Sequence, residues 1–283
     1  MIERYVYKGV QYQSIRDISD PSFVHYGKKA MRRQLYIREP MGASIISRPF
    51  DGIDCLAWKG VTLLPAKKTY DMALAVASIV DRRNSPCTIG EIGTGSGIFP
   101  ITIASLLDHR NDITLVATDI SGAALEAATI NARINEIPED LICWKKTDGL
   151  TEVSSQVPGF DIIFSNPPFT RTEKAKRINK SGFQPHTALD GGPNGAQFYV
   201  QFTNEAVPML NRGGLLIFQL PLELDGIEAV IRSTRPLFQR VPYHLLFDTE
   251  NRYTNPSPLF LTIGATKEIA QQFCDYKYRV VSI

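Results

Sequence analysis

The chain has 283 residues, of which 43% are apolar, enough for one sizeable core and a small accessory piece. Lys and Arg total 31 against 29 for Asp and Glu, and this net charge of +2 neither favours nor excludes a nucleic-acid partner. The sequence shows no signal-peptide pattern, no apolar run near the roughly 20 residues of a membrane span, and no CxxC motif among its four cysteines. We therefore expect a cytoplasmic protein that has no membrane segment and no metal site.

Residues 1–60 are polar and weakly periodic, and we interpret them as a small N-terminal accessory domain that caps a substrate. Within this region, apolar residues over 53–64 are interrupted by Gly60, which suggests a short hairpin. Residues 67–80 repeat apolar side chains at helical spacing, which predicts a helix. The main domain is expected to span residues 61–283.

From Cys87 onward, short apolar strands alternate with helical patterns. Alternation with short connections predicts a doubly wound α/β fold, a mostly parallel seven-stranded sheet with helices on both faces. Ligands of such sheets bind beyond the carboxyl ends of the strands. The expected strands are 88–92, 113–118, 141–145, 161–165, 215–220, 243–247 and 259–263, and the expected helices are 98–107, 123–134, 196–210 and 226–235.

A glycine-rich turn follows the first strand of this predicted sheet. Gly93, Gly95 and Gly97 stand at alternate positions, where they let the backbone approach a ligand closely. A dinucleotide fingerprint would require glycine in place of Ile98, and the Gly-Lys-Ser/Thr of a phosphate loop is absent. Glu91 places a carboxylate beside the turn, which suits a cationic ammonium or sulfonium ligand. The alternative is a structural strand-to-helix turn without a ligand.

Two acidic residues follow the second and third strands. Asp119 lies about twenty residues beyond the glycines, where a carboxylate can accept hydrogen bonds from both hydroxyls of a ribose. Its alternative role is to cap the next helix, which Ser121 could also do. Asp148 precedes Gly149 and could accept a hydrogen bond from the exocyclic amine of adenine, although Asp-Gly is also an ordinary turn pair.

The motif Ser165-Asn166-Pro167-Pro168-Phe169 follows the fourth strand. The two prolines hold an extended backbone that offers few donors. The side-chain carbonyl of Asn166 and the backbone carbonyl of Pro167 can accept both hydrogens of a planar –NH2 group, on which Phe169 could stack. Positioning of this kind can supply ~7–11 kcal/mol of a barrier. A rigid turn at the strand end is the alternative.

Together these motifs resemble the class I S-adenosylmethionine (SAM)-dependent methyltransferases of the N-methylating group, over roughly residues 60–265. The stretch 188–195, Ala-Leu-Asp-Gly-Gly-Pro-Asn-Gly, is similar to a segment of release factor glutamine methyltransferases (HemK-like), whose Asn-Pro-Pro-Tyr motif binds the glutamine amide. The resemblance implies a Rossmann-like enzyme that uses SAM to methylate an amide or amine nitrogen, most simply that of a protein glutamine. It implies acceptor contacts by Asn166, Pro167 and Phe169, and cofactor contacts by Glu91, Gly93, Gly95, Gly97, Asp119, Asp148 and Asn166.

Departures from that family pattern keep other acceptors open. Phe169 stands where the family has tyrosine, and only Thr69 matches the family's Arg-Pro-Glu-Thr-Glu stretch. A small metabolite enclosed by residues 1–60, or a flipped adenine of RNA or DNA, would also offer a planar –NH2 group. A SAM-binding scaffold without turnover is the fourth hypothesis. Residues 170–195 form a long connection rich in Lys and Arg, which fits either a mobile basic lid or a solvated face.

Overall fold

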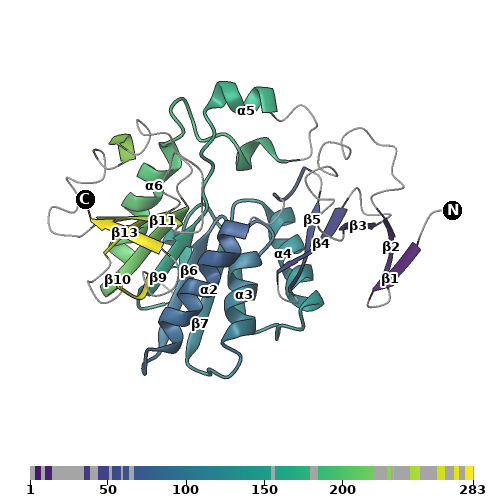
Figure 1. The fold of residues 1–283 in the computed structure, drawn as a ribbon, viewed down its shortest axis with the longest axis horizontal. Helices are drawn as coiled ribbons and strands as arrows, with labels where there is room; N and C mark the ends of the chain where they lie inside the picture. Colours follow the sequence, from purple (N-terminus) through teal and green to yellow (C-terminus); the bar gives the residue numbers. More distant parts are fainter. Residues whose placement is uncertain are drawn as a thin grey trace.

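The structure is a computed structural model, and two sheets organise the part of the chain that it describes (Figure 1). The described residues are 4–7, 10–14, 35–38, 44–50, 53–58, 60–63, 67–153, 157–178, 184–219, 228–230, 232, 243–248, 260–264, 271–273 and 278–282.

The N-terminal sheet has five antiparallel strands whose neighbours follow chain order. They are β1 (Arg4–Tyr7), β2 (Val10–Ser14), β3 (Leu35–Arg38), β4 (Ser44–Phe50) and β5 (Ile53–Trp58).

The prediction of a hairpin within 53–64 is wrong, because β5 pairs instead with the preceding strand β4. The chain then turns at Gly60, whose φ is +74°, and the described residues 60–63 form no second strand. Ile53 and Cys55 of β5 are buried in the core of the main domain. The domain boundary at residue 60 stays a prediction, and the contacts of β5 tie this sheet to the rest of the molecule.

The central sheet has eight strands in the order β13-β11-β12-β10-β9-β6-β7-β8. The parallel part contains five of them, and β12, β11 and β13 continue the sheet antiparallel to their neighbours. The bounds are β6 (Cys87–Ile92), β7 (Ile113–Asp119), β8 (Ile142–Lys146), β9 (Phe160–Ser165), β10 (Leu210–Gln219), β11 (Tyr243–Asp248), β12 (Phe260–Ile263) and β13 (Tyr278–Ser282).

The doubly wound, mostly parallel sheet predicted from the sequence is therefore confirmed. The predicted count of seven strands is one short, because β13 was not recognised. Among the described strands, this five-residue strand pairs with β11 alone. So short a strand is defined by its backbone partner rather than by its own sequence pattern.

Helices cover both faces of the sheet. These are α2 (Lys67–Asp81), α3 (Ile98–Leu106), α4 (Gly122–Ile134) and α6 (Gln197–Ala206), whereas the short helix α5 (Thr172–Ile178) lies apart from the sheet (Figure 1). Only 228–230 and 232 of the predicted helix 226–235 are described, and these residues are helical. The predicted helix 196–210 ends at Ala206, because a 3-10 turn containing Pro208 follows before β10 begins.

Two apolar clusters lie on opposite faces of the sheet. Ile162 and Phe164 of β9 pack into the cluster that contains α2 and α3 residues, whereas Ile163 packs into the cluster that contains α6 residues. This alternation is the period of two expected for a parallel strand that is buried on both faces. The loops at the carboxyl ends of β6–β9 remain free to build a site.

None of the helices in the described part of the chain is long and apolar enough to cross a membrane. The cytoplasmic location expected from the sequence stays a prediction.

Candidate functional site

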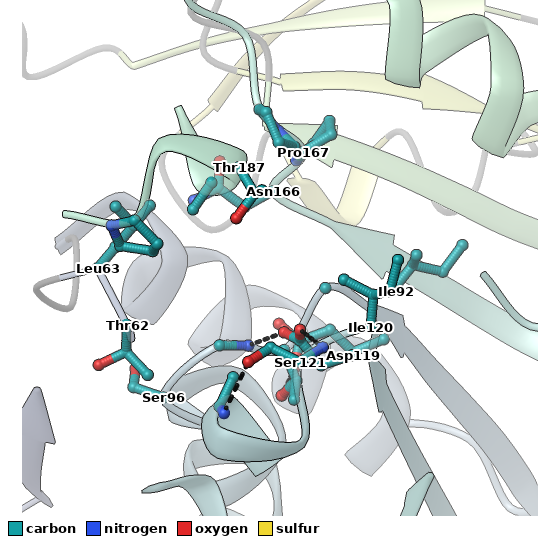
Figure 2. Close-up of a pocket in the computed structure, with 18 of the residues that line it drawn as sticks. Thr62, Leu63, Ile92, Ser96, Asp119, Ile120, Ser121, Asn166, Pro167 and Thr187 are labelled. Carbon is teal, nitrogen blue, oxygen red and sulfur yellow. Dashed lines mark hydrogen bonds between the residues drawn. The ribbon is translucent and has the colours of Figure 1, made fainter. Parts of the chain in front are cut away.

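A cavity of about 390 Å³ lies beyond the carboxyl ends of β6, β7, β8 and β9. Two walls face one another across it (Figure 2). The glycine wall comprises residues 91–96, 119–121 and 147–149, which follow β6, β7 and β8. The proline wall comprises 60–63, 166–168, Pro185, Thr187 and Ala188. The rest of the lining is Thr69, Ile98, Ala124, and Phe198 and Phe202 of α6.

The glycine turn is held against the end of β7. The backbone N–H groups of Gly93 and Thr94 both donate to the Thr118 carbonyl oxygen at 2.9 Å. Gly93 and Gly95 have φ angles of +72° and +55°, which L side chains rarely adopt. A Cβ atom added to either glycine would meet no atom within 4 Å, and both residues line the cavity. These two glycines therefore keep the space beside the turn open.

Gly97 has a different role from the one expected. It lies outside the cavity lining and precedes α3, with a φ of +77°. An added Cβ atom would approach Ala128, Trp144 and Ile101 at 3.0–3.2 Å. The structure therefore explains Gly97 by close packing between helices and sheet, and not by contact with a ligand.

Glu91 is buried beside the turn, with 3% of its surface exposed. The pKa of its carboxyl group is raised to about 8, mainly by burial; a hydrogen bond from Thr94 Oγ1 opposes the shift, and the negative charge of Asp119 adds to it. The group therefore retains its proton at neutral pH, and a cation entering the cavity would favour the ionised form.

Asp119 is oriented by backbone groups on both of its oxygens. The N–H of Gly95 donates to Oδ2 and that of Ser121 donates to Oδ1, each at 2.9 Å (Figure 2). Burial raises the pKa of Asp119, and these two bonds lower it. Ser121 caps α4, because its hydroxyl accepts a hydrogen bond from the Ala124 N–H at 3.2 Å. Ser121, and not Asp119, therefore caps α4, and the carboxylate of Asp119 faces the cavity.

The turn after β8 brings two more side chains to the glycine wall. Asp148 is exposed and lines the cavity, as its predicted role requires. Thr147 also lines it, with 7% of its surface exposed, and its hydroxyl has no hydrogen-bond partner within the described structure. Sequence reasoning missed Thr147, since a threonine before an Asp-Gly turn carries no distinctive signal.

Asn166 and Pro167 lie on the proline wall, across the cavity from Asp119 and Ser121 (Figure 2). The side-chain oxygen Oδ1 of Asn166 is buried and accepts no hydrogen bond from any described group. Most buried polar atoms in folded proteins have a partner. An unpaired acceptor that borders a cavity is therefore available to a donor on a ligand.

Phe169 does not lie where sequence reasoning expected it. It is absent from the cavity lining and packs against the apolar cluster around α6. Its side chain gains apolar burial there, which the mouth of the cavity would not provide. Phe198, which was not predicted, supplies an aromatic side chain to the lining, and its ring lies 5.7 Å from that of Phe202.

The segment 188–195 braces the Asn-Pro-Pro corner. Thr170 N–H donates to the Leu189 carbonyl at 2.9 Å, and Gly191 N–H donates to the Thr170 carbonyl at 2.8 Å. A Cβ atom on Gly191 would lie 2.7 Å from the Pro168 carbonyl oxygen, so only glycine permits this approach. The brace holds the neighbouring residues 185–188 beside the cavity.

The basic character of 170–195 is partly compensated. Lys176 Nζ lies 3.0 Å from Glu173 Oε1 on the exposed helix α5. His186 is exposed, lies outside the cavity lining, and places Nδ1 4.0 Å from Asp190 Oδ2. Lys180 lies outside the described residues. The mobile basic lid stays a prediction.

Comparisons with known proteins identify the family of this chain. Residues 76–184 match the model of the methyltransferase small domain family. A release factor glutamine methyltransferase of Rhodopirellula baltica is 30% identical over 230 residues, which cover 76% of this chain and 73% of that protein. One from Clostridium acetobutylicum is 29% identical over 60% of this chain, which here spans only 59% of that relative. The segment 76–184 contains the whole glycine wall and Asn166.

A solved structure of a ribosomal protein L11 methylase from Lactobacillus delbrueckii is 21% identical, with a TM-score of 0.42. The match covers 67% of this chain and 74% of that one.

Proposed function

This chain belongs to the SAM-dependent N-methyltransferases that include the release factor glutamine methyltransferases, and we propose that its acceptor is the side-chain amide of a protein glutamine. The observation that supports this choice of acceptor is the buried side-chain oxygen of Asn166, which lies at the edge of the cavity and has no described hydrogen-bond partner. An acceptor atom of this kind requires a donor, and a carboxamide offers two N–H groups. The relatives are named as methyltransferases of a release factor glutamine.

The glycine wall fits SAM, which supplies a methyl group already activated by a sulfonium. Gly93 and Gly95 leave room that any side chain would fill. The buried carboxyl of Glu91 suits the positively charged end of the cofactor, because a cation stabilises its ionised form. We assign the ribose hydroxyls to Asp119 and the adenine amine to Asp148, since both carboxylates face the cavity and can only accept when ionised.

The proline wall fits a flat –NH2 group. Asn166 Oδ1 would accept one N–H, and the carbonyl of Pro167 would accept the other. The lone pair of an amide nitrogen is delocalised, so holding both hydrogens favours the geometry in which this lone pair points at the methyl carbon. The nitrogen lone pair would form the new N–CH3 bond as the S–CH3 bond breaks with its electron pair left on sulfur, and the nitrogen would release one proton to water. No covalent intermediate with the protein is required.

A small amide or amine metabolite is the second candidate acceptor. The observation that favours it is that residues 60–63, directly after the N-terminal sheet, line the same cavity. A wall supplied from this region would enclose a small molecule more readily than it would admit a protein loop. Adenine in RNA or DNA is a weaker candidate, because the chain has no large basic excess.

The test combines a bacterial release factor with the purified protein and methyl-labelled SAM. We expect the label on a glutamine side chain, located by mass spectrometry of the digested release factor. Asn166→Ala should abolish the transfer. Asn211→Ala is a matched control, since Asn211 lies at the start of β10, where it bonds to Asp161 at 3.2 Å. Label that appears only on small amides offered in parallel would contradict the protein acceptor and support the second candidate.

A further inference from the structure

We propose that Thr147 is a further cofactor-binding residue, whose hydroxyl donates a hydrogen bond to a ring nitrogen of the adenine base. The inference rests on the proposed function only through the binding of SAM in this cavity, and it does not depend on the acceptor.

The unpaired hydroxyl of Thr147 is unusual among the buried threonines described. Thr102 Oγ1 donates to the Ile98 carbonyl at 2.6 Å, Thr118 Oγ1 to that of Glu91 at 3.1 Å, and Thr203 Oγ1 to that of Tyr199 at 2.6 Å. Thr147 is also buried, with 7% of its surface exposed against 0% for these three, and it lines the cavity, yet its hydroxyl has no described partner. A buried hydroxyl without a partner destabilises the protein. An atom of a bound ligand is therefore the natural candidate for the missing hydrogen-bond partner.

The position of Thr147 indicates which part of the cofactor it meets. Its backbone N–H donates to the Asp119 carbonyl at 3.1 Å, which holds the turn after β8 to the end of β7. Asp148 follows directly and lines the same wall. Thr147 therefore lies beside Asp119 and Asp148, the two residues whose carboxylates we assign to the ribose and to the adenine amine.

The chemistry of adenine requires a donor at this place. Ionised Asp119 and Asp148 can only accept hydrogen bonds, whereas the edge of adenine presents ring nitrogens that also accept. A hydroxyl is the simplest donor for such a nitrogen. Thr147 thus complements the carboxylates, and the three side chains together match a base that carries both donors and acceptors.

The decisive variant is Thr147→Val, which removes the hydroxyl and preserves the shape of the side chain. We expect calorimetric titration with S-adenosylhomocysteine (SAH) to show affinity lower by about threefold to tenfold, the size typical of one neutral hydrogen bond. Thr147→Ser keeps a hydroxyl and should restore most of the affinity. Thr102→Val, a buried threonine inside α3 and away from the cavity, should leave the affinity unchanged.

A second measurement separates ligand binding from a structural role. Without ligand, Thr147→Val should melt no lower than the wild type, because it loses no internal hydrogen bond. SAH analogues in which one ring nitrogen of adenine is replaced by CH, at position 1 or position 3, then locate the partner atom. The analogue that lacks the partner nitrogen should bind the wild type more weakly than SAH, and it should bind Thr147→Val as well as SAH does.

Unchanged SAH affinity in Thr147→Val would overturn the inference. So would an equal loss for SAH and both analogues, because that pattern would indicate a change of shape and not a lost hydrogen bond. These titrations contain no acceptor, so a failure to methylate glutamine would leave this inference standing. A wild-type protein that bound no SAH would overturn both the inference and the cofactor assignment.

Discussion

The two walls of the cavity differ in how their polar groups are satisfied. On the glycine wall, Asp119 accepts a backbone N–H on each oxygen, and Glu91 accepts the hydroxyl of Thr94. On the proline wall, the oxygen of Asn166 has no described partner. The glycine wall therefore holds most of its side chains in place before any ligand arrives. The proline wall leaves hydrogen-bonding capacity free, so the choice of acceptor is expected to depend on it.

The largest expected effect tests this division directly. Asn166→Ala should lower the rate of methyl transfer by about 10²-fold or more, because the acceptor nitrogen is no longer held in line with the methyl group. The affinity for SAH should change by less than about twofold, because we assign the Asn166 oxygen to the acceptor amide and not to the cofactor. Single-turnover rates and calorimetry measure the two quantities. A parallel loss of both would remove the distinction between the walls.

The next effect concerns the proton that the buried carboxyl group of Glu91 holds in the glycine wall. The pKa of Glu91 is about 8 in the folded protein against 4.5 ordinarily, so between these values the folded state holds a proton that the unfolded chain has released. The free energy of unfolding should therefore fall as pH rises through this window, by a few kcal/mol at about 1.4 kcal/mol per pKa unit. Glu91→Gln should reduce the slope. Urea unfolding at several pH values measures it, and equal slopes in the two proteins would contradict the assignment.

Removal of the Asp119 carboxylate should have a smaller effect, which is measured as a loss of cofactor affinity. Asp119→Ala should cost about 1.5–3 kcal/mol of SAH affinity, the size of a charge-assisted hydrogen bond. Glu139→Ala is the control, because the exposed carboxylate of Glu139 pairs only with the exposed Arg133 in the described structure. Calorimetry should show no change in the control. If SAH affinity is the same in Asp119→Ala, the ribose does not bind there.

The smallest effect distinguishes two aromatic residues. Phe198→Ala should raise the KM for the acceptor by about twofold to tenfold, because the ring lines the cavity and a stacking contact contributes about 0.5–1.5 kcal/mol. Phe169→Leu should change KM little, since Phe169 packs into the apolar cluster around α6. Steady-state kinetics with the unmethylated release factor as acceptor compares them. A larger change in KM for Phe169→Leu would restore the stacking role expected from the sequence.

Much of the glycine wall could be predicted because each of its parts is local. Gly93 and Gly95 stand in one short turn, and Asp119 ends the next strand, so strand order alone brings them together. The proline wall was predicted less well. Phe169 was assigned to the cavity because it adjoins the Asn-Pro-Pro corner, yet Phe198 reaches the lining from a helix whose own pattern indicates only a buried face.

The sequence by itself determined the doubly wound sheet, the glycine turn and the Asn-Pro-Pro corner, because alternating apolar patterns, glycines and prolines act over a few neighbouring residues. Only the tertiary structure decided that Gly97 serves packing, that Gly191 lets the backbone approach Pro168, and that the oxygens of Thr147 and Asn166 lack described partners. Those facts depend on atoms brought together from distant segments. Burial and hydrogen-bond satisfaction are properties of the folded whole, and no local pattern contains them.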